Sequence, residues 1–181
     1  MKQLLNATAR VAGSAAIALL VTCSASAAPG EGANITGSWW FVGQYGPGMT
    51  LPTLVTFHAD RTTTASDAIM FGGIPGFPFK VTPFQGVWQR TGPLSFGGTS
   101  LMLVFDSTTN ALIGVARVRS DIQFDGDFNH LTGTIHGELL FCPTEFTCPD
   151  PTDRDAPWVP TTSGVPFTAV RVRHLRAGPL Q

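Results

Sequence analysis

The sequence predicts an all-β protein: a single antiparallel, mostly up-and-down barrel of eight strands, with a sandwich of two sheets as the alternative. Two observations lead to this prediction. The 20 glycines and 14 prolines are spread along the chain, and stretches rich in Val, Ile, Thr, Phe and Trp lie between them. Beyond the first residues, no segment repeats its apolar side chains over a long stretch with the period of an amphipathic helix. This pattern is typical of many short strands joined by turns.

We expect eight strands, at roughly 37–45, 52–59, 62–69, 84–90, 94–106, 110–125, 130–141 and 164–175. Most connections are short and contain the residue types that favour turns. Two connections are long. One, at 71–83, is rich in Gly, Pro and Phe, and the other, at 142–163, contains two cysteines and five prolines. Consecutive antiparallel strands leave unpaired edges unless the sheet closes, and eight strands close around side chains or one small ligand.

The register of 110–125 against 130–141 follows from their side-chain pattern. Pairing around the turn between them sets apolar residues opposite apolar residues or glycine on one face, and polar opposite polar on the other, as register selection requires. The second face then brings Arg119 opposite His136 and Arg117 opposite Glu138, a cross-strand combination of opposite charge.

Extending the pairing to 94–106 around a turn at Ser107–Thr109 places Leu103 opposite Ile113 and Leu101 opposite Val115. The second face is therefore charged at one end and apolar at the other. Either the 142–163 connection covers the apolar end, which makes this the outer face, or the face lines the interior. We favour the outer face, because charged residues are rarely fully buried unless they are paired.

Residues 1–27 predict a secretory signal peptide. Lys2 and Arg10 give a basic start, a mainly apolar run follows, and Ala25-Ser26-Ala27 fits the small-residue cleavage rule. The apolar run is shorter than the ~20 residues that span a bilayer. Cys23 lies in a loose likeness of a lipoprotein box, but Thr22 precedes it where a smaller residue is usual, so we do not expect lipidation. We expect residues 28–181 to form one domain, located in the periplasm or secreted.

The charge of 28–181 does not favour a nucleic-acid partner. Removal of residues 1–27 takes away two of the 11 basic residues and none of the 12 acidic ones, so no basic excess remains. No second apolar span is present, and we expect no membrane span. Cys142 and Cys148 would pair in an oxidising compartment. We expect neither a metal nor a cofactor, since no metal-ligand or cofactor motif is present and Asp125–Asn129, which resembles the start of a calcium loop, lacks its later Gly and Glu.

The first and last strands of the expected barrel resemble those of calycins, the superfamily of lipocalins and their relatives. Gly37-Ser38-Trp39 opens the first strand, and Arg171 and Arg173 lie on the last. In calycins a Gly-x-Trp stands on the first strand, and a basic residue of the last strand packs across the Trp. The resemblance implies an eight-stranded barrel and, by analogy, the binding of a small molecule. The loop motif built around Thr-Asp-Tyr and the C-terminal helix of lipocalins are not recognisable here.

Two groups of residues are candidates for a functional site. His136 and Glu138 could act as an acid–base pair beside Arg117 and Arg119, which could hold an enolate or carboxylate; an outer-face ladder of ion pairs is the alternative. The second group is apolar. The Gly- and Pro-rich connection at 71–83 carries aromatic rings suited to a flap over a barrel mouth, although it could instead plug one end of the barrel. For ligand contacts we expect Phe71, Phe77, Phe79 and Trp88.

The sequence leaves three functions open, and it does not decide whether the protein is an enzyme. The first is a binding module that holds a small apolar ligand under the Phe-rich connection. The second is a small barrel cyclase, isomerase or hydratase that uses His136, Glu138, Arg117 and Arg119. The third is a structural or interaction protein with a filled core. The presence and lining of an internal cavity discriminate among them. The ligand, the reaction and the oligomeric state do not follow from the sequence.

Overall fold

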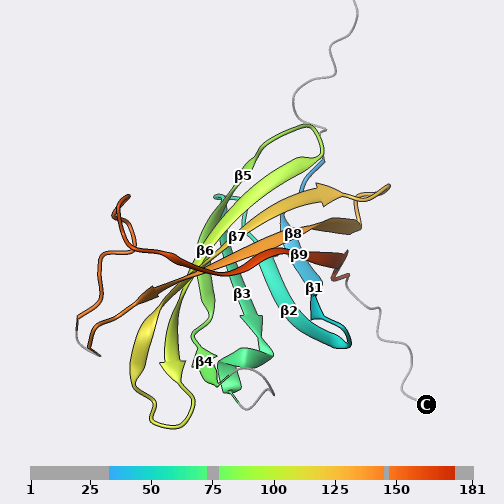
Figure 1. The fold of residues 1–181 in the computed structure, drawn as a ribbon. Helices are drawn as coiled ribbons and strands as arrows, with labels where there is room; N and C mark the ends of the chain where they lie inside the picture. Colours follow the sequence, from blue (N-terminus) through green and yellow to red (C-terminus); the bar gives the residue numbers. More distant parts are fainter. Residues whose placement is uncertain (1–32, 73–77, 145–146, 174–181) are drawn as a thin grey trace, which may run out of the picture. The chain divides into compact units, whose positions relative to one another are not determined.

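The computed structural model describes residues 33–72, 78–144 and 147–173, which belong to one compact unit (Figure 1). Nine strands and one short 3-10 helix make up this unit, in the order β1 (Gly37–Gly46), β2 (Met49–Phe57), β3 (Thr62–Asp67), η1 (Ala68–Phe71), β4 (Phe79–Val81), β5 (Phe84–Arg90), β6 (Ser95–Asp106), β7 (Leu112–Phe124), β8 (His130–Phe141) and β9 (Val159–Arg171). The predicted signal peptide lies outside the described residues. Among the helices of the described residues, none is long and apolar enough to cross a membrane.

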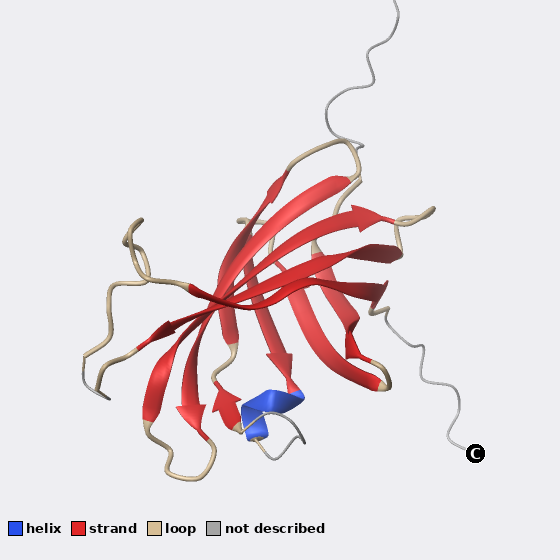
Figure 2. Cartoon of the chain, viewed as in Figure 1, coloured by secondary structure: helices blue, strands red, loops and turns tan. Residues whose placement is uncertain are grey.

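Eight of the strands close into an antiparallel barrel. The neighbours run β1-β2-β3-β5-β6-β7-β8-β9, and β9 returns to pair with β1 (Figure 1). Apart from the short helix η1, the regular elements of this unit are strands (Figure 2). The predicted barrel is therefore confirmed. The ninth strand, β4, is an addition to the prediction: it pairs with the last residues of β6, beyond the part that pairs with β5. It lies within the connection that the sequence predicted to be a loop.

The register of β7 and β8 agrees with the prediction, including Arg119 opposite His136 and Arg117 opposite Glu138. The register predicted for β6 and β7 was wrong by two residues, because Leu103 pairs with Val115 rather than with Ile113. The connecting turn is longer than predicted, with the Asp106 amide donating to the Ala111 carbonyl, and a bulge follows at Val104 and Phe105. Since side chains alternate with a period of two, a slip of two residues keeps the paired side chains on their faces. Ile113 is the exception: the bulge leaves it without a partner in β6, and it lines the cavity although the sequence placed it on the outer face.

One end of the barrel is filled by a packed core. Its members are mostly large apolar side chains that point inward: Ala33, Ile35, Trp39, Phe41, Phe57, Phe96, Ile122, Phe124, Leu131, Phe167 and Ala169. Trp39 is fully buried, and its indole N–H donates to the Ile35 carbonyl at 2.8 Å. The Arg171 guanidinium lies over the Trp39 ring, 4.2 Å from its centroid. Trp39 and Arg171 are thus in contact across the β1–β9 pair, as the resemblance to calycins implied.

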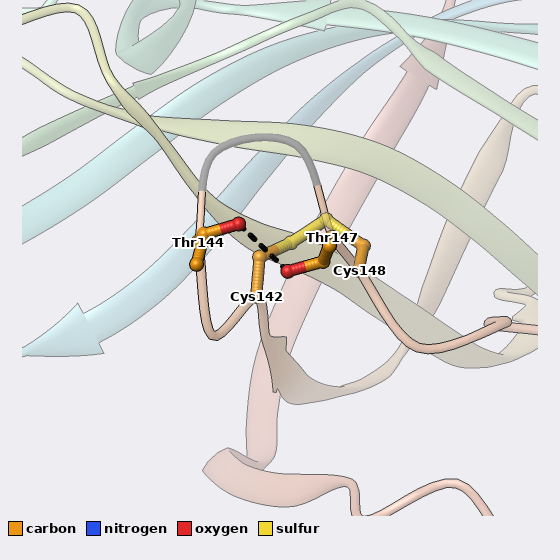
Figure 3. Close-up of a disulfide and its surroundings, with 4 residues drawn as sticks. All are labelled: Cys142, Thr144, Thr147 and Cys148. Atoms are coloured by element: carbon orange, nitrogen blue, oxygen red, sulfur yellow. Dashed lines mark hydrogen bonds between the residues drawn. A yellow bond between two sulfur atoms is a disulfide. The ribbon is translucent and has the colours of Figure 1, made fainter.

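Cys142 and Cys148 form the predicted disulfide, with their Cα atoms 4.2 Å apart (Figure 3). The bond closes a short loop at the start of the long β8–β9 connection. Inside the loop, the hydroxyls of Thr144 and Thr147 hydrogen-bond at 2.7 Å. At the other end of the connection, Trp158 lies against Arg117, whose guanidinium is 4.1 Å from the ring centroid. β9 begins directly after it, five residues earlier than the sequence predicted.

Candidate functional site

The half of the barrel opposite the packed core encloses a cavity of about 340 Å³. This volume is near the lower end of the ~300–1,000 Å³ that small-molecule sites occupy. It is roughly twice the ~150 Å³ of an engineered apolar cavity that takes up benzene. Most of the lining is apolar and comes from every strand of the barrel, including Phe41, Leu51, Val55, Phe84, Met102, Val104, Val118, Ile135 and Leu139.

The cavity exists because small residues face inward along this part of the barrel. Ala65 of β3, Gly98 and Ser100 of β6 and Ala116 of β7 all line it. At the opposite end, the inward positions carry Phe and Trp rings that meet in the middle. An eight-stranded barrel is just wide enough for large side chains to fill it, so small ones leave space.

The cavity is bounded at its outer end by the segment that follows β3. Ile69 of η1 and Phe79 and Val81 of β4 line it. Ile69 and Val81 are buried, and both belong to a second apolar cluster with Leu51 and Val104. The predicted Phe-rich connection therefore contributes ordered side chains to the wall of the cavity.

The four predicted ligand contacts have different positions. Phe79 lines the cavity, whereas Phe71 is 86% exposed. Trp88 packs edge-on against Phe57 and Phe96 of the filled end, and its indole N–H donates to the His58 carbonyl at 3.0 Å. Phe77 lies outside the described residues.

Asp67 is a polar group of the cavity that the sequence analysis did not select. It is 7% exposed and lies on the inward face of β3, in line with Thr63 and Ala65, which also line the cavity. One carboxylate oxygen caps η1 by accepting from the Ile69 amide at 2.9 Å. Burial raises the pKa of the Asp67 carboxyl, while hydrogen bonds from the backbone of Ile69 and Met70 oppose that rise. The sequence offered only a weak indication of this role for Asp67, because the strand was expected to continue through residue 69.

Tyr45, the only tyrosine of the chain, lies close to this carboxylate. Its ring folds back over Gly43, where an added Cβ would come within 3.0 Å of the ring. Burial first, and the negative charge of Asp67 second, raise the pKa of the Tyr45 hydroxyl to about 12. The hydroxyl therefore stays protonated at neutral pH, and the cavity contains a phenol and a carboxyl group within electrostatic reach of each other.

The structure brings the four predicted acid–base residues together on the outer face of β7 and β8. Glu138 accepts from Arg117 Nε at 2.7 Å and from an Arg119 terminal nitrogen at 3.0 Å. The Glu138 and Arg117 side chains are only 13% and 24% exposed, whereas that of Arg119 is 54% exposed. Arg117 and Glu138 also border the cavity, near the place where the β8–β9 register shifts. The pair is more shielded from solvent than a surface ladder would be.

The chemistry of this cluster favours ion pairing over proton transfer. The hydrogen bond from Arg117 is the main cause that lowers the pKa of the Glu138 carboxyl, which makes it a weak base. His136 Nδ1 accepts from the Gly164 amide at 3.3 Å, so the neutral ring carries its proton on Nε2. Nε2 lies 3.8 Å from the exposed Asp121 carboxylate rather than beside Glu138.

The Asp125–Asn129 turn, considered as the start of a calcium loop, forms a hairpin turn held by its own side chains. Asp127 accepts from the Asn129 amide at 2.6 Å and pairs with His130 at 3.0 Å. These contacts use both carboxylate oxygens of Asp127 within the turn.

Comparisons with known proteins add no assignment: the chain matches no family model, no curated protein and no solved structure. The function must therefore be argued from the cavity and the side chains around it.

Proposed function

We propose that this protein is a calycin-like binding protein that holds one small, mainly apolar molecule inside its barrel. The observation that supports the proposal is the cavity of about 340 Å³ among apolar side chains, at one end of a barrel whose other end is filled. A mainly apolar, concave site with a few polar groups is the usual form of a small-molecule site. The contact of Arg171 with Trp39 supports the calycin-like assignment.

Binding is favoured over catalysis because of where the acid–base candidates lie. Arg119 and His136 are not among the lining residues, and the carboxylate of Glu138, which borders the cavity, is already held by two guanidinium groups. A filled core, the third alternative, is less favoured because the small side chains at the level of Ala65 and Ala116 leave the barrel hollow.

The protein would act outside the cytoplasm. The Cys142–Cys148 disulfide supports this location, since structural disulfides persist in oxidising compartments. Amino-terminal sequencing of the protein from its source should find Ala28 or Pro29 first. Recovery of a chain that begins at Met1 or at a lipidated Cys23 would contradict the proposed route.

Filling the cavity tests the proposed binding. Ala116→Phe places a ring in the cavity. The wild-type protein should bind a neutral fluorescent apolar probe, N-phenyl-1-naphthylamine, which small hydrophobic competitors displace, and the variant should lose this binding. Ala111→Phe is the matched control, because Ala111 lies in the β6–β7 turn and not among the lining residues. Circular dichroism would verify that both variants fold. Equal probe binding by the Ala116→Phe variant and the wild-type protein would disprove an internal site.

A further inference from the structure

Asp67 places a negative charge in an otherwise mainly apolar cavity. It is one of only two buried polar or charged residues in the described chain, and the other is the uncharged Thr63. The Ile69 amide that donates a hydrogen bond to it is a neutral group and supplies no positive charge. Among the described residues, no ion pair includes Asp67.

The other charged groups that border the cavity compensate each other. Arg117 and Glu138 form their own ion pair at 2.7 Å, so Arg117 does not balance the charge of Asp67. Tyr45, whose hydroxyl remains protonated, can donate a hydrogen bond but supplies no positive charge. A buried carboxylate is rarely left without a cationic or strongly donating partner. Within the part of the chain that the structure describes, no residue supplies a cation to the Asp67 side of the cavity.

We propose that Asp67 is the polar anchor of the cavity and that the ligand is a small apolar molecule bearing a protonated amine. The amine would donate to the free lone pairs of the Asp67 carboxylate, and the apolar body would occupy the space between Leu51, Met102 and Val118. This inference rests on the proposed binding function. The raised pKa of the Asp67 carboxyl is consistent with it, because an unbalanced buried charge is what a bound cation would stabilise.

Three competitors of equal chain length test the anchor: octylamine, octan-1-ol and octanoate, each displacing N-phenyl-1-naphthylamine at neutral pH. The amine should bind at least about tenfold more tightly than the alcohol, since a charge-assisted hydrogen bond is roughly twice as strong as a neutral one and the buried charge is compensated. Octanoate should bind most weakly, because it would bring a second negative charge to Asp67. Equal affinity for the amine and the alcohol would overturn the proposal without any variant being needed.

Asp67→Asn separates the ligand role from the capping role. Asparagine caps helices about as well as aspartate, so the Ile69 amide keeps its acceptor while the charge is removed. The variant should lose the preference for octylamine, about tenfold in affinity, and retain its affinity for octan-1-ol. Asp60→Asn is the control, since Asp60 is an exposed turn residue that accepts from Thr62 outside the cavity. Asp60→Asn should leave the preference unchanged.

The outcomes distinguish the two proposals. If octylamine, octan-1-ol and octanoate all fail to displace the probe, the internal binding site itself is wrong, and the anchor with it. If they bind but Asp67→Asn retains the preference for the amine, binding stands and the anchor is wrong. Tighter binding of octanoate than of octylamine would also overturn the anchor, because it would indicate a neutral, proton-donating carboxyl group.

Discussion

The Arg171 guanidinium lies 4.2 Å above the centroid of the Trp39 ring, and it also donates hydrogen bonds to three backbone carbonyls. Its terminal nitrogens reach Thr36 and Asn34 at 2.7 and 2.6 Å, and Nε reaches Phe128 at 3.1 Å. One side chain thus joins the segment before β1 to the β7–β8 turn, across the filled end of the barrel.

Removal of Arg171 should therefore destabilise the fold. We expect Arg171→Ala to lower the free energy of unfolding by about 2–4 kcal/mol, through the loss of charge-assisted hydrogen bonds and the cation–π contact. Arg171→Lys should recover only part of this, because an ammonium cannot replace the planar, forked donor. Arg173→Ala is the control on the same strand end, where the side chain is exposed. Urea unfolding measures all three, and an equal loss in Arg171→Ala and Arg173→Ala would contradict the assigned role.

Neutralising Asp67 should stabilise the ligand-free protein at neutral pH. The pKa of this carboxyl is raised above its ordinary value of 3.8, so the native state binds the proton more tightly than the unfolded chain does. The stabilising contribution of the protonated Asp67 carboxyl is therefore fully present below its unfolded pKa, and it is lost as the pH rises through its folded pKa. Asp67→Asn should melt at a higher temperature than the wild-type protein at pH 7, and the difference should shrink as the pH falls below 4.

Asp60→Asn should change stability in the opposite direction. Hydrogen bonds from Thr62 lower the pKa of the Asp60 carboxyl, so its charged form favours the folded state. This contribution is present above the unfolded pKa and is lost as the pH falls through the folded pKa. Thermal melts of both variants across the acid range would test the two signs together, and the same sign for both would contradict the burial of Asp67.

The Glu138 cluster should contribute moderately to stability. Glu138→Ala leaves the shielded Arg117 without its partner, and we expect a loss of about 1–3 kcal/mol. Arg119→Ala removes a half-exposed partner, and it should stay within about 1 kcal/mol. A double-mutant cycle between Arg117 and Glu138 would measure their coupling directly. A loss below 0.5 kcal/mol in Glu138→Ala would indicate a fully solvated surface pair instead.

The disulfide should stabilise the protein only modestly. It closes a loop between residues six apart in sequence, and loop entropy gives at most about 2–3 kcal/mol for so short a loop. Reduction, or replacement of Cys142 and Cys148 by serine, should lower the melting temperature without unfolding the barrel, which has no strand inside the loop. Thiols that react with an alkylating reagent before reduction would contradict the disulfide.

The sequence was sufficient for the barrel and for one strand pair, and the reason is local. β7 and β8 are joined by a short turn, so alternation along both strands determined the Arg117–Glu138 and Arg119–His136 pairs. Across the β6–β7 connection the same reasoning slipped, because the bulge at Val104 and Phe105 leaves no mark in the alternation. The slip moved partners along the strand, and the bulge placed Ile113 among the cavity-lining residues instead of on the predicted outer face.

The cavity could not be predicted in this way. It depends on small residues such as Ala65, Gly98 and Ala116 facing the same space, although they come from three different strands. That alignment follows from the stagger of all the strands around the barrel, which no single turn determines. Asp67 was missed for a related reason: its role follows from η1, which begins at Ala68 where the sequence favoured two more strand residues.

The pairing of β1 with β9 also has a consequence for how the protein is made. The barrel closes through contacts such as Trp39 with Arg171 and Gly43 with Phe167, which join the first strand to the last. A ribosome delivers β9 only after every other strand, so a growing chain cannot complete the wall to which Thr161 and Thr162 belong. Such distant pairings slow folding, because the chain loses the entropy of closing a long loop before the contacts between its ends stabilise it. The cavity therefore forms only once β9 has been synthesised, and a chain that ends before Val159 would not enclose it.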